Sequence, residues 1–130
     1  MILDSSAVIA ILRAEPEARD FTVAMMSAPI RRLSAVNYVE TAAVIDGERD
    51  PLASRRLDDF FRTTRITVES VTPEQAQIAR QAYRDFGKGR NKTGLNLGDC
   101  FAYALAKDLD EPLLYKGREF NHTDVERAEY

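Results

Sequence analysis

Short apolar runs alternate along this chain with longer stretches in which apolar residues recur every three or four positions. The short runs have the length of buried strands, and the periodic stretches are typical of amphipathic helices. The expected strands are residues 1–4, 30–33, 66–71 and 112–115. Because strands and helices alternate, we predict an α/β fold: a central, mostly parallel sheet of four or five strands, flanked by helices on both faces.

Capping residues mark the expected helix starts. Ser5 and Ser6 can begin a helix directly after the first strand, and Ser34 can cap another. Thr72 is expected to cap a later helix, with Gln75 completing a capping box. The helix after Ser34 is expected to turn its apolar positions toward the core, namely Val36, Val39, Ala43 and Val44.

Length and composition predict one folded domain over residues 1–130. The chain is 45% hydrophobic and 30% charged, as expected for a globular protein without disordered tracts. Its apolar runs are far shorter than the roughly 20 residues of a membrane helix, and no signal peptide is recognisable. Cys100 is the only cysteine, which excludes an internal disulfide. We therefore expect a cytoplasmic protein without a membrane partner.

Four acidic residues occupy positions that folding alone does not explain. Asp4 ends an apolar strand, Glu119 follows another, and Glu40 and Asp99 lie on the apolar faces of predicted helices. No Lys or Arg occupies the matching helical position beside Glu40 or Asp99, and burial of an unpaired carboxylate is costly. Carboxylates that gather at the carboxyl ends of parallel strands suit Mg²⁺ or Mn²⁺. Such an ion can activate water for attack on a phosphodiester.

Each acid also has a purely structural interpretation. Asp4 could be a helix cap, Asp99 could favour the positive end of a helix dipole, and Glu119 could be simple surface charge. Asp124 is a second candidate for the fourth acid. A zinc site is improbable because His122 is the only histidine.

The net charge of -3 does not indicate a nucleic-acid binder, so any basic surface must be local. The clearest candidate is the segment from Arg84 to Gly94. It contains Lys88, Arg90 and Lys92, which could contact the phosphates of a nucleic acid.

Several segments together resemble a known family. They are Met1-Ile2-Leu3-Asp4-Ser5-Ser6-Ala7, Tyr38-Val39-Glu40, Gly87-Lys88-Gly89-Arg90, Asn96-Leu97-Gly98-Asp99-Cys100 and Leu113-Leu114-Tyr115-Lys116-Gly117. Taken together they resemble VapC toxins, which are PIN-domain ribonucleases, over nearly the whole chain.

The resemblance implies a PIN-like domain and an endoribonuclease that depends on Mg²⁺ or Mn²⁺ and leaves a 5′-phosphate. By this resemblance Asp4, Glu40 and Asp99 surround the metal, and Glu119 stands where the family often has an aspartate. It further implies a cognate VapB-like antitoxin and a homodimer.

Polar residues beside the acids have open roles. A hydroxyl of Ser5 or Ser6 could support Asp4 or contact substrate, or serve only in helix capping. Asn37, one helical turn before Glu40, could bond the Glu40 carboxylate or a substrate phosphate.

Rival functions fit less well. A phosphoacceptor receiver domain needs an acidic pair after its first strand, and a haloacid-dehalogenase-like phosphatase needs an aspartate two residues after Asp4; neither is present. The remaining alternative is a catalytically inactive module on the same fold that binds RNA or an antitoxin.

Overall fold

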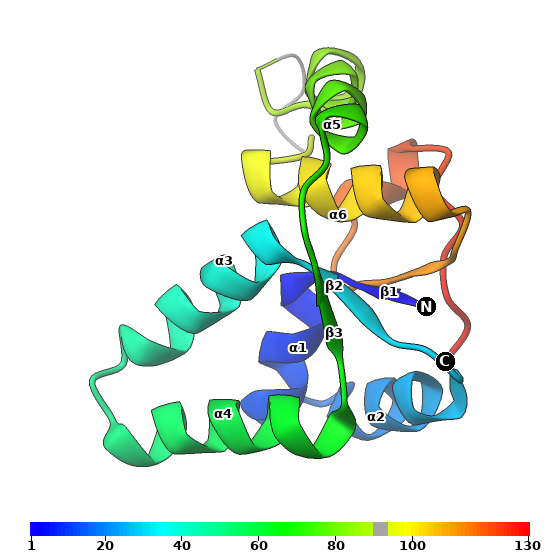
Figure 1. Ribbon diagram of the computed structural model, residues 1–130. Helices are drawn as coiled ribbons and strands as arrows, with labels where there is room; N and C mark the ends of the chain where they lie inside the picture. Colours follow the sequence, from blue (N-terminus) through cyan, green and yellow to red (C-terminus); the bar gives the residue numbers. More distant parts are fainter. Residues whose placement is uncertain (90–93) are drawn as a thin grey trace.

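The computed structural model describes residues 1–89 and 94–130, in which strands and helices alternate (Figure 1). The strands are β1 (Ile2–Leu3), β2 (Arg32–Ser34), β3 (Thr67–Glu69) and β4 (Leu113–Leu114). The helices are α1 (Ser5–Leu12), α2 (Ala18–Ser27), α3 (Ala35–Asp46), α4 (Pro51–Thr64), α5 (Pro73–Phe86), α6 (Leu97–Leu109) and the 3-10 helix η1 (Glu119–His122). Within the described ranges, no helix has the length and apolar character needed to cross a membrane.

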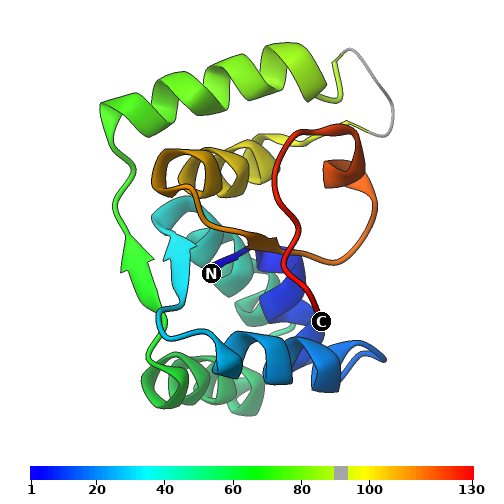
Figure 2. The same cartoon turned by 90° about the vertical axis from the view of Figure 1, so that its right-hand side faces the viewer.

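The strands form one parallel sheet in the order β3-β2-β1-β4. Leu3 in the interior strand β1 pairs with Leu33 on one side and with Leu114 on the other. This confirms the predicted α/β architecture, with four strands. The C-terminal tail runs along the outer edge of β4, where Leu113 forms a parallel bridge with Arg127 (Figure 2).

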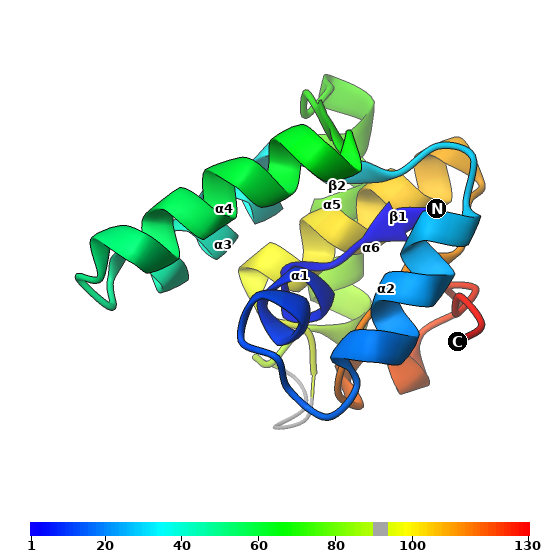
Figure 3. The ribbon, with the colours of Figure 1, turned by 90° about the horizontal axis from the view of Figure 1, so that it is seen from below.

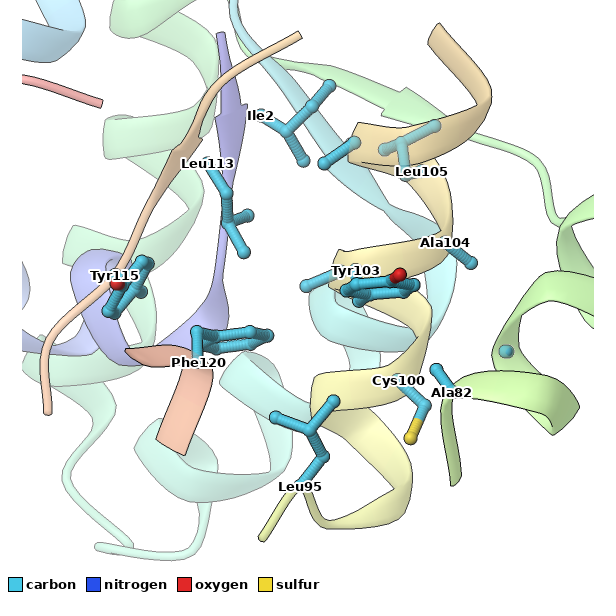
Figure 4. Packing of buried hydrophobic residues seen from close by; sticks show 13 residues of the cluster. Ile2, Ala82, Leu95, Cys100, Tyr103, Ala104, Leu105, Leu113, Tyr115 and Phe120 are labelled. Atoms are coloured by element: carbon cyan, nitrogen blue, oxygen red, sulfur yellow. The ribbon is translucent and has the colours of Figure 1, made fainter. Parts of the chain in front are cut away.

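Successive residues of β1 face opposite sides of the sheet, as the period of a strand requires. Ile2 belongs to an apolar cluster with α5, α6 and the segment after β4 (Figure 4). Leu3 belongs to a second cluster with α1 and α2, and both residues are fully buried. Helices therefore cover both faces, with α5 and α6 on one side and α1, α2 and α4 on the other (Figures 1 and 2).

The helix starts follow the predicted capping chemistry with one difference. α1 begins at Ser5, and Asp4 is its N-cap, a role that the sequence had left open for Asp4. Ser34 caps α3, and Thr72 caps α5 through its hydroxyl, as predicted. The side chain of Gln75, however, donates to Asp108 over 3.1 Å, so the expected reciprocal capping box is replaced by a contact between α5 and α6.

The buried face of α3 differs from the prediction. Its buried residues are Asn37, Thr41 and Ile45, whereas Val39, expected on the inner face, is 63% exposed. Two polar side chains can be buried here because the Thr41 hydroxyl donates to the Asn37 carbonyl and the Asn37 amide donates to the Gly98 carbonyl. The helices α3 and α4 also project from the sheet as a hairpin, which leaves the outer side of α3 in solvent (Figure 3).

Candidate functional site

A pocket of about 270 Å³ lies where the chain leaves the carboxyl ends of β1 and β4. Its lining includes all four acids singled out above, Asp4, Glu40, Asp99 and Glu119. We call this site the acidic pocket. The edge of the sheet at which it lies is where ligands bind in open α/β folds.

Asp4 is fixed at the floor of the acidic pocket by the start of α1. Its Oδ2 atom accepts a hydrogen bond of 3.0 Å from the Ser6 backbone N–H, as an N-cap does. Its Oδ1 atom is buried and has no hydrogen-bond partner in the described part of the chain. Burial, opposed by the hydrogen bonds from Ser6 and reinforced by the charge of Glu40, raises the pKa of Asp4 to about 6.

Asp99 is fixed by the start of α6. Its Oδ2 atom accepts from the Asn96 backbone N–H over 3.0 Å, and the Asn96 side chain accepts from the Asp99 backbone N–H over 2.8 Å. This capping box holds the carboxylate in one orientation. Burial, together with the charges of Asp4, Glu119 and Glu40, raises the pKa of Asp99 to about 7. The four carboxylates are therefore close enough to repel one another.

Glu40 is held by polar groups from two helices. The Ser5 hydroxyl donates to Glu40 Oε1, and the Asn37 amide lies 3.4 Å from the same atom. Of the roles predicted for Ser5, the structure places its hydroxyl on Glu40 rather than on Asp4. Asn37 is 0% exposed, so of its two predicted roles the carboxylate bond fits the geometry, whereas contact with a substrate phosphate does not.

Glu119 reaches the acidic pocket through the turn after β4. Gly117 adopts a φ of 101°, a conformation that side chains disfavour, and the turn places Glu119 at the start of η1. Asp124 lies elsewhere: it accepts from the Tyr103 hydroxyl over 2.6 Å and from the Lys107 ammonium over 3.0 Å. Of the two candidates for the fourth acid, only Glu119 lines the pocket.

The donor set suits a hard divalent cation held with the help of water. Among the described residues no group of three or more His, Cys, Asp or Glu side chains is arranged as a ready-made cage for an ion. Mg²⁺ does not need one, because it commonly binds through one or two carboxylates and retains several waters. The unpartnered Asp4 Oδ1 atom and the raised pKa values of Asp4 and Asp99 fit such an ion.

Basic side chains also border the acidic pocket. Lys88 lines it, whereas Arg90 and Lys92, the other predicted RNA contacts, lie outside the described residues. Lys116 lines it as well, and its ammonium pairs with Glu15 and, over 3.2 Å, with Glu17. The pairs hold Lys116 at the rim.

Three functional features were not predicted from the sequence. They are the role of Asn96 in orienting Asp99, the place of Lys116 in the lining, and the contact of Gly98 with Glu40. The spacing Asn96-x-x-Asp99 is that of a capping pair and could have indicated that Asn96 orients Asp99. The position of Lys116 just after an apolar strand could have indicated that it lines the pocket.

The fold and the acidic pocket define an α/β protein whose site lies across the carboxyl ends of a parallel sheet. The family model of the PIN domain matches residues 1–126, so the chain belongs to the PIN domain family. The family resemblance drawn from the motifs is thereby confirmed.

A curated relative and two solved structures extend this result. The chain is 52% identical over 129 residues to Ribonuclease VapC28 of Mycobacterium tuberculosis, covering 98% of this chain and 97% of the relative. The structure of VapC20 of M. tuberculosis, described as a sarcin-ricin loop cleaving toxin, matches with a TM-score of 0.73 at 16% identity over 95% of each chain. VapBC2 of Rickettsia felis, bound to a promoter DNA fragment, matches with a TM-score of 0.74 at 12% identity over 98% of this chain and 96% of its own. At these identities the two structures establish the fold alone.

Proposed function

We propose that this protein is the toxin of a VapBC-type toxin–antitoxin pair and acts as an endoribonuclease that depends on Mg²⁺ or Mn²⁺. The observation that carries the proposal is the gathering of Asp4, Glu40, Asp99 and Glu119 around one pocket, with a buried Asp4 oxygen that has no donor among the described residues. The full-length relationship to a protein named as a VapC ribonuclease supports the choice of RNA as substrate.

In this proposal Asp4, Asp99 and Glu40 surround a cation that keeps several waters, and Glu119 contributes negative charge beside it. When bound, Mg²⁺ supplies a Lewis acid that neutralises phosphodiester charge and lowers the pKa of an attacking water. The chain's own groups orient the carboxylates: Ser6 and Asn96 fix Asp4 and Asp99 through backbone N–H groups.

Two described basic residues line the acidic pocket, Lys88 and Lys116, and of these Lys116 is paired with Glu15 and Glu17. We therefore assign RNA binding to Lys88. We assign the same role to Arg90 and Lys92 from the sequence. A cation beside clustered carboxylates attracts the phosphate backbone and reduces its repulsion by the acids.

The proposed partners are RNA, a VapB-like antitoxin and a second copy of the chain. The antitoxin is supported by the fold shared with VapBC2 of R. felis. Binding of an antitoxin is expected to block access to the acidic pocket.

The test uses the purified, antitoxin-free protein and a total RNA pool. Incubation with Mg²⁺ or Mn²⁺ should generate new 5′-phosphate ends, which sequencing of the ends would map. EDTA and Asp4→Asn should both abolish them. Cleavage at the same positions by folded Asp4→Asn protein would contradict the assigned site. Cleavage that persists in EDTA would contradict the dependence on a metal ion.

A further inference from the structure

Gly98 lies directly beneath the carboxylate of Glu40, at the second residue of α6. A Cβ atom built on Gly98 would lie 2.7 Å from Cδ and 2.9 Å from Oε1 of Glu40. Real Cβ atoms essentially never come within 3.0 Å of another atom, so a side chain at position 98 would force the flexible end of Glu40 to move away from its place. The space that a side chain would take at position 98 is therefore occupied by the functional end of Glu40.

The backbone conformation at position 98 does not require glycine. Gly98 lies within a regular helix, and Gly117 is the glycine with a positive φ in the described part of the chain. Glycine is also a poor helix former, and alanine would normally be preferred at an interior or early helical position. The contact with Glu40 is thus the physical reason for a glycine here.

The Asn37 side chain contacts both Gly98 and Glu40. Its amide Nδ2 donates to the Gly98 carbonyl over 3.0 Å and lies 3.4 Å from Glu40 Oε1. The side chain is fully buried, and its Oδ1 atom has no partner within the described ranges. A buried amide with an unsatisfied oxygen costs stability, which indicates a residue retained for its geometry.

We propose that Gly98 is a positioning residue. Because Gly98 has no side chain, the Glu40 carboxylate can lie against the first turn of α6, next to Asp99. Asn37 holds α3 and α6 in this relative position. The inference rests on the proposed function for its catalytic meaning. Its geometric content, that position 98 sets the place of Glu40, stands apart from any reaction.

The test is a size-compensation cycle of four proteins: wild type, Gly98→Ala, Glu40→Asp and the double variant. Mn²⁺ affinity is measured by calorimetry, and the Mg²⁺ concentration for half-maximal RNA cleavage is measured in parallel. Gly98→Ala should weaken Mn²⁺ binding by about 10- to 100-fold, because a displaced ligand resembles a lost supporting contact. Glu40→Asp removes one methylene and makes room for the new Cβ, so the double variant should bind no more weakly than Glu40→Asp alone.

Gly89→Ala is the matched control, because among the described residues a Cβ there meets only the Tyr83 hydroxyl, at 4.0 Å. It should leave Mn²⁺ affinity unchanged. Two outcomes would overturn the proposal. One is a double variant whose loss of Mn²⁺ affinity equals the product of the two single losses, and the other is a Gly98→Ala protein with wild-type Mn²⁺ affinity.

Thermal unfolding without metal keeps the geometric inference separate from the proposed function. Gly98→Ala should lower the unfolding temperature in the wild-type background and leave it equal or higher in a Glu40→Ala background, where the obstructing carboxylate is gone. Equal destabilisation in both backgrounds would refute the contact. Failure of the wild type to cleave any RNA would instead refute the proposed function, whatever the unfolding cycle gives.

Discussion

The two ends of the same parallel strands both carry acidic residues, yet they treat charge in opposite ways. At the amino ends, Glu111 accepts from the Met1 ammonium over 2.6 Å and from Arg32 over 3.1 Å. At the carboxyl ends, no ion pair within the described ranges involves any acid of the acidic pocket. Glu111 at one edge is neutralised by ion pairs, whereas the acids of the acidic pocket at the other edge have no cationic partner among the described residues.

This difference has an energetic meaning. A carboxylate whose pKa is raised in the folded state destabilises that state when ionised, whereas a paired carboxylate does not. Asp4 and Asp99 belong to the first kind. The fold thus gives up stability at one edge of the sheet, and a bound cation would restore it.

Asp99→Asn should have the largest effect on activity. Loss of a carboxylate from the proposed metal site should lower the RNA cleavage rate on the order of 1000-fold. The asparagine is nearly isosteric, so the fold should persist, and without metal the variant should be at least as stable as the wild type at pH 8. Cleavage assays with saturating Mg²⁺ and thermal unfolding would check both results; a cleavage rate within threefold of wild type would remove Asp99 from the site.

The pH dependence of stability should show the second largest effect. The folded pKa of Asp4, about 6, lies above its ordinary value of 3.8, so the folded state holds the proton more tightly. The stabilisation that Asp4 contributes in its protonated form is fully present below pH 3.8 and is lost as pH rises through 6. The loss amounts to about 3 kcal/mol at 1.36 kcal/mol per pKa unit.

Urea unfolding in EDTA, from pH 4 to pH 8, measures this loss. Asp4→Asn should remove part of the slope between pH 4 and pH 6, and Asp99, whose pKa is raised to about 7, should account for slope that persists up to pH 7. Mg²⁺ added to the wild type should offset the loss at pH 8. A wild-type slope that Asp4→Asn leaves unchanged would count against a buried, uncompensated Asp4.

Glu111→Gln at the opposite edge should show the reverse pattern. Removing the charge leaves the Met1 ammonium and Arg32 with one partner fewer, and the partly buried pairs should cost about 1–2 kcal/mol of unfolding free energy. The rate of RNA cleavage should not change, because Glu111 is remote from the acidic pocket. A cleavage defect in a protein that remains folded would break the division of labour between the two edges.

Asp124→Asn should have the smallest effect. Asp124 holds the C-terminal segment to α6 through Tyr103 and Lys107, and its side chain is 63% exposed. Loss of this exposed ion pair should cost at most about 1 kcal/mol and leave cleavage unchanged. Glu119→Gln is its counterpart and should reduce cleavage with little effect on stability. Reduced cleavage by Asp124→Asn, with unchanged cleavage by Glu119→Gln, would assign the fourth acid to Asp124.

Much of the fold could be predicted because local signals agreed with one another. The apolar runs, Ser34 and Thr72 placed strands and helix starts that the structure contains. The identity of the buried side of α3 could not be predicted, because Asn37 is buried only by virtue of a carbonyl on α6, sixty-one residues further along the chain. Hydrophobic periodicity ranks such an amide as surface and Val39 as core.

The acids of the candidate site could be found from the sequence because each stands out against its immediate neighbours. Asp4 and Asp99 interrupt apolar segments, and both line one pocket in the structure. What supports them is set by tertiary contacts: the Ser5 hydroxyl on Glu40 and the space above Gly98 arise only when α1, α3 and α6 meet. Their catalytic roles remain predictions that the variants above would test.

The strand order has a consequence for the protein during its synthesis. The interior strand β1 comes before both of its neighbours along the chain, and β4 comes after the other three strands, with Glu119 behind it. A nascent chain can therefore bring together Asp4 and Glu40 early, but until β4 and Glu119 have been made it lacks the final acid and half of the pairing of its interior strand. The acidic pocket is thus one of the last parts of the fold to be completed, because it needs contacts between segments that are far apart in the sequence.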